Sequence, residues 1–132
     1  MADTFLADIE NFEKRTVQNM IYIAVNSVQD VVEGAQTPQR GVTKGGTFEE
    51  GKIPVAEAEL INSLTTDGTK GAESYVFALA GYQIGDSMQF AWTAPHAMPM
   101  EVGTKHTRGR HFVGLNAKRF VEFVQKYAGE FT

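Results

Sequence analysis

The segment HAMPMEVGTKHTRGRHF, residues 96–112, concentrates the side chains that could do chemistry in this chain. It holds all three histidines, His96, His106 and His111, and Glu101 is its only carboxylate. No two of these histidines lie one helical turn apart, as ligands on a shared helix face would, and no facial triad is evident. Surface or subunit-contact histidines therefore explain the segment better than a metal centre, with a small metal-dependent enzyme kept as a rival hypothesis.

A second stretch imitates a nucleotide-binding loop. Residues 46–53, GTFEEGKI, match a P-loop up to its last position, where the motif needs Ser or Thr to bind magnesium and this chain has Ile53. Glu49 and Glu50 would also face the phosphates. The chain has no Gly-x-Ser-x-Gly nucleophile motif either. We therefore expect neither enzyme activity nor a cofactor.

The composition is typical of a soluble globular protein. The 132 residues suit one domain, and 42% of them are hydrophobic. No apolar run approaches the ~20 residues that a membrane-spanning helix needs. Residues 1–15 carry acids where a signal peptide has a basic end and an apolar centre. Cysteine is absent, which excludes disulfides and thiolate-bound zinc. We expect a protein made in the cytoplasm, without membrane association.

Charge is divided unevenly along the chain. Residues 1–100 carry 6 basic and 13 acidic side chains, a net charge of −7, whereas residues 101–132 carry 6 and 3, a net charge of +3. This division favours head-to-tail contact between identical subunits. A nucleic-acid-binding module is an alternative, although the acidic whole would repel phosphates, and a solvated charged face is another. The cations concerned lie between Val102 and Phe120, with no acid among them: Lys105, Arg108, Arg110, Lys118 and Arg119.

Residues 1–34 are predicted to form one long helix. Apolar side chains follow a 3–4 spacing that includes Phe5, Ile9, Phe12 and Met20. About 30 helical residues are roughly 45 Å long, whereas a compact domain of this size has a radius of gyration of about 14 Å. The helix must therefore overhang its own domain, bend, or lie against a neighbour. A kinked helix in the core of a monomer is the alternative.

A loop and a small sheet are expected next. Residues 35–52 are polar and glycine-rich and indicate a flexible loop. Residues 53–113 are predicted to contain a small, mostly antiparallel sheet, since apolar and polar residues alternate from Met88 to Trp92. Residues 74–80 form an apolar run that suits a strand or a short helix, and we favour the strand.

The end of the chain is predicted to be helical. Residues 98–102 suggest a further extended piece, which Pro99 would hold at a sheet edge. Residues 114–132 are then expected to form a helix that Asn116 caps and Gly129 ends. The predicted fold is therefore a single α+β domain with a long N-terminal helix, a small sheet and a C-terminal helix.

The motifs in residues 96–113 resemble those of a family of small neck proteins of long-tailed bacteriophages, the tail-completion and tail-terminator proteins. That family carries a Tyr-Ala-x-x-x-Glu-x-Gly-Thr segment and then an Arg-x-Phe-Leu or Arg-x-Phe-Val segment leading into a C-terminal helix. His96 replaces the family's Tyr, and His111 replaces the Pro usually found between Arg and Phe. The matching residues are Ala97, Glu101, Gly103, Thr104, Arg110, Phe112 and Val113.

Two further stretches carry the resemblance, which covers residues 54–124. The run GDSMQFAWTAPHA, residues 85–97, is similar to a Gly-Asp, strand, Trp-Thr-Ala-Pro-Tyr-Ala run of some members. The family's Pro-Val-Asp-Thr-Gly-x-Leu-x-Asn-Ser pattern is also present, with Ala56, Glu57 and Ala58 in place of Asp-Thr-Gly and one extra residue before the Leu. Its matching residues are Pro54, Val55, Leu60, Asn62 and Ser63.

The resemblance implies a structural virion protein of the phage neck. Such a subunit forms a ring, sixfold in expectation, that joins the tail tube to the head-tail connector and does no chemistry. Its partners would be other copies of itself and the neighbouring tube and connector proteins, with DNA passing through the lumen without specific binding.

Physical reasoning adds roles for the residues that match. Gly103 would allow a backbone turn barred to other residues, and Arg108 and Arg110 would pair with carboxylates on a neighbour. Phe112 would anchor the exit into the last helix, and the Met-Pro-Met element would offer a soft contact surface. The predicted subunit or partner contacts are therefore Met98, Met100, Glu101, Gly103, Thr104, Lys105, Arg108, Arg110 and Phe112.

Overall fold

Helices dominate the structure, a computed structural model that describes residues 2–39, 50–54, 59–105 and 108–131. The strands are β1 (Pro38–Gln39), β2 (Ile53–Pro54), β3 (Leu64–Thr66), β4 (Thr69–Lys70) and β5 (Phe90–Trp92). The predicted α+β class, with a long first helix and helices at the C-terminus, is confirmed. The helices are α1 (Ala2–Ala35), α2 (Glu59–Asn62), α3 (Ser74–Ala80), α4 (Ala97–Val102), α5 (Gly114–Lys118), α6 (Phe120–Ala128) and the 3-10 turn η2 (Gly129–Phe131).

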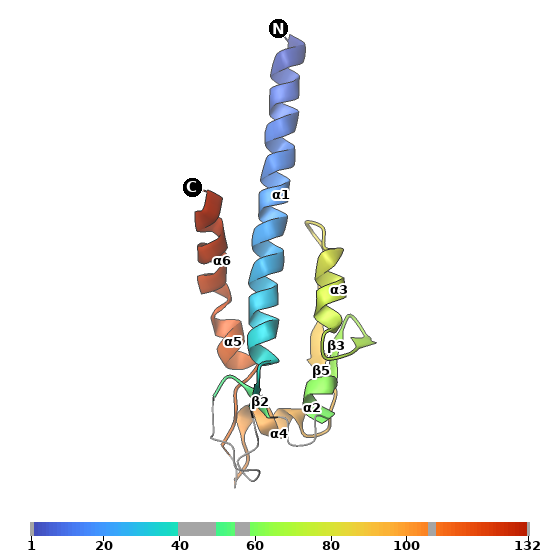
Figure 1. The fold of residues 1–132 in the computed structure, drawn as a ribbon, viewed down its shortest axis with the longest axis vertical. Helices are drawn as coiled ribbons and strands as arrows, with labels where there is room; N and C mark the ends of the chain where they lie inside the picture. The colour runs from blue at the N-terminus through green and yellow to red at the C-terminus, as the bar shows by residue number, and fades with distance from the viewer. Residues whose placement is uncertain (1, 40–49, 55–58, 106–107, 132) are drawn as a thin grey trace.

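Helix α1 forms the long axis of the molecule, and its first half projects beyond every other element (Figure 1). No proline or glycine interrupts the sequence before Gly34, so each residue can continue the helix. Its 34 residues correspond to about 51 Å. Every residue from Thr4 to Gln18 is exposed. The structure therefore shows the overhang, which was one of the three predicted arrangements, and not a kinked helix within a monomer's core.

The second half of α1 packs against the C-terminal helices, with α5 and α6 on one side and α3 on the other (Figure 1). The Tyr22 ring meets the edges of Tyr127 and Phe131 at centroid distances of 5.9 and 5.4 Å. The Tyr127 hydroxyl donates to Asp30 Oδ2 at 2.6 Å. This hydrogen bond, together with burial, raises the pKa of Tyr127 to about 12. Phe131 in η2, the last element, packs against Tyr22, so the C-terminal helices cover α1 only as far as this residue.

The sheet has three antiparallel strands in the order β4-β3-β5. Leu64 pairs with Trp92 and Thr66 with Phe90, so the predicted strand of residues 88–92 is shortened to its last three residues. Strands β1 and β2 form a separate parallel pair. The mostly antiparallel prediction is confirmed. Most of the loop predicted at 35–52 (residues 40–49) lies outside the described residues.

Two buried clusters form the core at the C-terminal end of α1. Trp92 packs against both of them from β5, and this position joins the sheet to the helices. The first cluster contains Ala35, Ile53, Leu60, Ala94 and Phe112, and the second contains Val32, Leu64, Tyr75 and Leu79.

Two segments predicted as extended are helical instead. In α3, Tyr75 and Leu79 lie one turn apart and are buried, whereas Phe77 is exposed, so a helical period separates core from surface. Residues 97–102 form α4, where Pro99 occupies the first turn and needs no backbone N–H donor. The predicted strand at 74–80 and the predicted sheet edge at Pro99 are therefore wrong.

The C-terminal helix is broken at Arg119 into α5 and α6, and Gly129 follows its last α-helical residue as predicted. Asn116 does not cap it. This residue lies inside α5, is buried, and its Nδ2 donates to the Phe112 and Gly51 carbonyl oxygens at 2.7 and 2.8 Å. The side chain therefore ties α5 to the strand β2 region.

Gly34 lies directly against Asn116, where an added Cβ would collide with the amide oxygen of that side chain. Asn116 cannot retreat without losing its two hydrogen bonds. We expect Gly34→Ala to destabilise the fold by about 1–2 kcal/mol, because the overpacking cost exceeds the helix-propensity gain. Urea unfolding measures this. Gly81→Ala is the matched control, with no atom near its Cβ, and equal stability of the two variants would contradict the packing described.

Candidate subunit interface

The predicted contact residues lie on α4 and in the segment that leads from α4 to α5. The Met100 and Glu101 carbonyl oxygens accept the backbone N–H groups of Arg110 and His111 at 2.7 and 3.0 Å. Gly103 pairs with Arg108 across the turn and has a φ of 90°. This is the left-handed region that favours glycine, so the expected special backbone at Gly103 is confirmed, although the chain leaves a helix there and not a strand.

Glu101 acts inside its own chain. Its Oε1 accepts the Val113 N–H at 2.9 Å and its Oε2 accepts the Gly114 N–H at 2.7 Å. These are donors at the start of α5 that have no partner within that helix. The carboxylate also compensates the positive end of the helix dipole. Glu101 therefore fixes the position of α5 relative to α4.

Replacing Glu101 by alanine is expected to cost about 2 kcal/mol of unfolding free energy, because two backbone donors and the helix terminus lose their acceptor. Thermal or urea unfolding measures the loss. Glu122→Ala removes an exposed carboxylate on α6 that forms a surface ion pair with Arg119. That control should stay within about 0.5 kcal/mol of the parent. A neutral Glu101→Ala would contradict the capping role.

Phe112 lies in the core with 1% of its surface exposed. Its ring meets the Trp92 ring edge-on, with centroids 5.4 Å apart. The role of an anchor before the last helix agrees with these contacts. Such burial leaves no Phe112 surface for a neighbouring subunit, so the predicted partner contact is replaced by a core contact.

The two arginines of the turn also act within the chain. Arg110 is buried, and its Nη1 donates to the Arg108 carbonyl oxygen at 2.8 Å. Burial, and next the charge of Arg108, lowers the pKa of Arg110. Arg108 Nη2 lies 3.3 Å from Glu50 Oε1, and both side chains are well exposed. The carboxylate expected on a neighbour is therefore found in the same chain for Arg108, in a surface pair of small energetic value.

The remaining contact candidates lie at the surface. Thr104 and Lys105 are exposed in the turn. Met98 is 67% exposed, whereas Met100 packs partly against the first core cluster. The predicted soft contact surface is therefore divided, with only Met98 fully available on α4.

Lys118 and Arg119 form a second basic site, at the joint between α5 and α6, and both are exposed. The Arg119 guanidinium lies 4.7 Å from the centre of the Phe123 ring and pairs with Glu122 at 3.5 Å. The cations of residues 102–120 are thus split between a turn and a helix joint.

The geometry gives little support to a metal site or to a nucleotide-binding loop. In the part of the chain that the structure describes, no group of three His, Asp or Glu side chains could hold a metal ion, and His106 lies outside that part. His111 has a φ of 50°, a value that proline cannot adopt. Of the P-loop-like stretch, residues 46–49 lie outside the described residues, and Ile53 is completely buried in β2.

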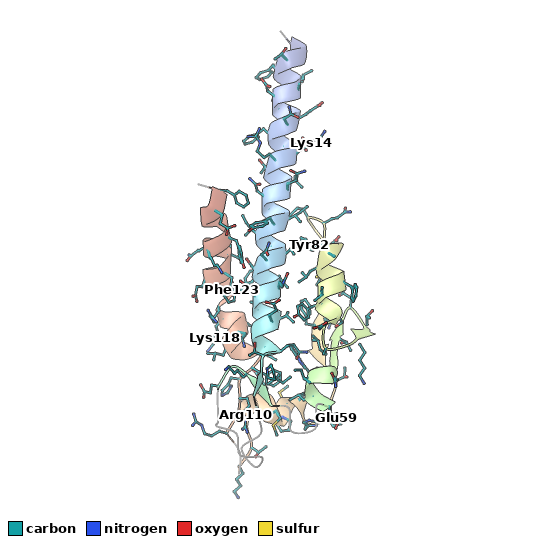
Figure 2. All side chains as sticks on the ribbon, viewed as in Figure 1. Lys14, Glu59, Tyr82, Arg110, Lys118 and Phe123 are labelled. Atoms are coloured by element: carbon teal, nitrogen blue, oxygen red, sulfur yellow. The ribbon has the colours of Figure 1, made fainter. Side chains whose placement is uncertain are left out.

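A groove that the sequence did not reveal lies over the second half of α1. It encloses about 210 Å³ and is lined mainly by apolar groups from α1, α3, the approach to β5 and the start of α6. Tyr82 lies at the end of α3 beside α1 (Figure 2). We call it the α1/α3/α6 groove; among its lining residues are Ala24, Val28, Leu79, Tyr82, Met88 and Phe120. Its parts are too distant in the chain for a sequence pattern to join them.

Within the described residues, every helix is too short or too polar to cross a membrane. Comparison with known protein families, with curated proteins and with solved structures finds no match for this chain.

Proposed function

We propose that this chain is a structural virion protein of the phage neck, a tail-completion or tail-terminator subunit. Copies of it would form a ring between the tail tube and the head-tail connector. The proposal rests on the resemblance carried by residues 54–124 and on the shape of the molecule. It assigns binding and assembly to the chain and no catalytic step.

The observation that carries the proposal is the uncovered first half of α1. Residues 4–18, which we call the projecting segment, are all exposed, and within the described part of the chain no other element packs against them. Phe5 is 66% and Phe12 68% exposed. Burial of a phenylalanine side chain contributes roughly 1.5–3 kcal/mol, so a helix of this kind gains considerably from a partner surface.

Charge supports a partner of the same kind. The projecting segment carries the acids Asp8, Glu10 and Glu13 in its first part and the bases Lys14 and Arg15 after them, a net charge of −1, whereas Lys118 and Arg119 are exposed at the α5–α6 joint. A subunit with an acidic surface at one end and a basic surface elsewhere can associate head-to-tail with other copies of itself. Heterologous contacts of this kind close into rings when the rotation between subunits permits.

Native mass spectrometry of the chain, and electron microscopy of the chain mixed with purified tail tubes, test the proposal. We expect a closed homo-oligomer that also appears at one end of the tubes. Monomers alone in both experiments would overturn the proposal. A homo-oligomer that does not bind the tubes would show that the protein assembles with itself, but it would refute the proposed position in the neck.

A further inference from the structure

None of the residues that the structure describes covers the apolar side chains of the projecting segment. Helix α1 is continuous, so the segment points away from the domain and cannot fold back onto it (Figure 1). Phe12 lies twelve residues before Ala24, the first α1 residue of the groove, which corresponds to about 18 Å along the helix. A partner must therefore supply any cover.

The groove offers a mainly apolar surface that could receive bulky side chains from a helix lying across it. Its floor is α1, one wall is α3 with the approach to β5, and Phe120 at the start of α6 lies on the other side. Phe120 is 40% exposed. Grooves of this form accept a helix that inserts bulky side chains at i, i+3, i+4 and i+7.

We propose that the projecting segment of one copy occupies the α1/α3/α6 groove of the next copy. This inference rests on the proposed ring and names the two surfaces that would build it. Phe5 and Phe12 are seven residues apart with Ile9 between them, which is the spacing that a groove of this kind receives.

The width of the apolar surface favours a groove over a simple pair of α1 helices. The apolar side chains of the segment span an arc of about 140° around the helix axis, with Phe12 at one edge and Val17 at the other, and Glu13 and Thr16 lie inside this arc. A two-helix seam uses a narrower stripe, whereas a helix packed on a wider surface uses an arc of more than about 100°. Two buried phenylalanines supply roughly 300–500 Å², and Leu6, Ile9 and Val17 bring the segment toward the ~800 Å² per partner of a standard interface.

Charge also favours a second copy of this chain as the partner. Phe120 directly follows the exposed cations Lys118 and Arg119 in the chain, so two cations lie next to this edge of the groove, whereas the acid Asp86 lines the groove itself. Asp8 lies at one edge of the stripe, about 40° around the helix axis from Phe12, and Glu13 lies within it, about 40° from Ile9. In a neighbouring copy Asp8 and Glu13 would lie near the two cations. The contact is heterologous and so can continue around a ring.

Disulfide cross-linking tests the contact, because the chain contains no cysteine of its own. Phe12→Cys is combined in one chain with Tyr82→Cys or with Phe120→Cys, on opposite sides of the groove. A disulfide needs Cα atoms within ~7 Å, so the distance along α1 excludes a bond within one chain. We expect oxidation of at least one double variant to give a ladder of covalent oligomers, and each single variant to remain uncross-linked.

A substitution series completes the test. Phe12→Ser should raise the concentration at which the assembly half-dissociates by roughly thirtyfold or more, without changing the helical circular dichroism of the subunit. Phe77→Ser, at an 83% exposed position on α3 that does not line the groove, is the matched control and should leave assembly unchanged.

The failures of the two proposals differ. If the assembly persists in the Phe12→Ser variant and the double-cysteine variants form no covalent oligomers, this contact is overturned but the proposed ring is not. Cross-linking of Phe12→Cys with itself would show paired α1 helices and also overturn it. Monomers under all conditions would overturn the contact and the ring together.

Discussion

Replacement of Phe112 by alanine is expected to destabilise the protein by about 3–5 kcal/mol, the range for a buried phenylalanine that leaves a cavity. The side chain is almost fully enclosed. It touches Trp92 edge-on and belongs to the first core cluster with Ile53 and Leu60. These neighbours come from separate segments, so they cannot collapse together into the space that the ring leaves. The loss is a large fraction of the 5–15 kcal/mol that typically stabilises a domain.

Urea unfolding followed by tryptophan fluorescence measures this loss, since Trp92 is the chain's single tryptophan. Phe77→Ala is the matched control, because the 83% exposed ring of Phe77 contributes little to the core; its stability should stay within about 0.5 kcal/mol of the parent. If Phe112→Ala kept its stability but lost assembly, Phe112 would be a subunit contact and its place in the core would be contradicted.

Gln36→Leu is expected to cost about 2–4 kcal/mol, because it leaves three polar groups without their partner. The Gln36 Nε2 donates to the Ile61 and Ala72 carbonyl oxygens at 2.9 and 3.0 Å. Its Oε1 accepts the Trp92 Nε1–H at 2.8 Å. One buried amide thus joins the end of α1 to α2, to the turn before α3 and to β5. Leucine has a similar volume but no hydrogen-bonding atom.

The unfolding free energy of Gln36→Leu is compared with that of Gln125→Leu, the same exchange at an exposed position on α6. The control is expected to stay within about 0.5 kcal/mol of the parent. Trp92 fluorescence of the folded Gln36→Leu variant should also change, since the indole N–H loses its acceptor. Equal stability of the two leucine variants would contradict a bonding role for Gln36.

The sequence predicted the fold where local signals were strong. Helix α1 has an apolar stripe that only Thr16 weakens and no Gly or Pro before Gly34, so its length could be inferred and an overhang could be expected. Residues 74–80 were predicted wrongly because an apolar run has no clear period, and only packing against α1 decides between strand and helix. Pro99 was placed at a sheet edge, but a proline in the first turn of a helix is equally acceptable.

The contact residues were located better than their roles were assigned. Glu101, Arg110 and Phe112 do lie on α4 and in the segment that follows it, but each is used within the chain as a helix cap, a buried donor or a core residue. The sequence shows residue type and spacing and does not show burial. Gln36 gave no signal at all, because a glutamine after a helix is ordinary until its three distant partners are known.

Hydrogen–deuterium exchange of the projecting segment tests most directly whether another copy covers it. At concentrations where the protein assembles, exchange of the backbone amides of residues 4–18 should be slower by about a hundredfold or more than in the dilute subunit. Phe12→Ser should abolish that protection. Rapid exchange of these amides at every concentration, in an assembly that is otherwise intact, would contradict the claim that α1 is completed by a neighbouring copy.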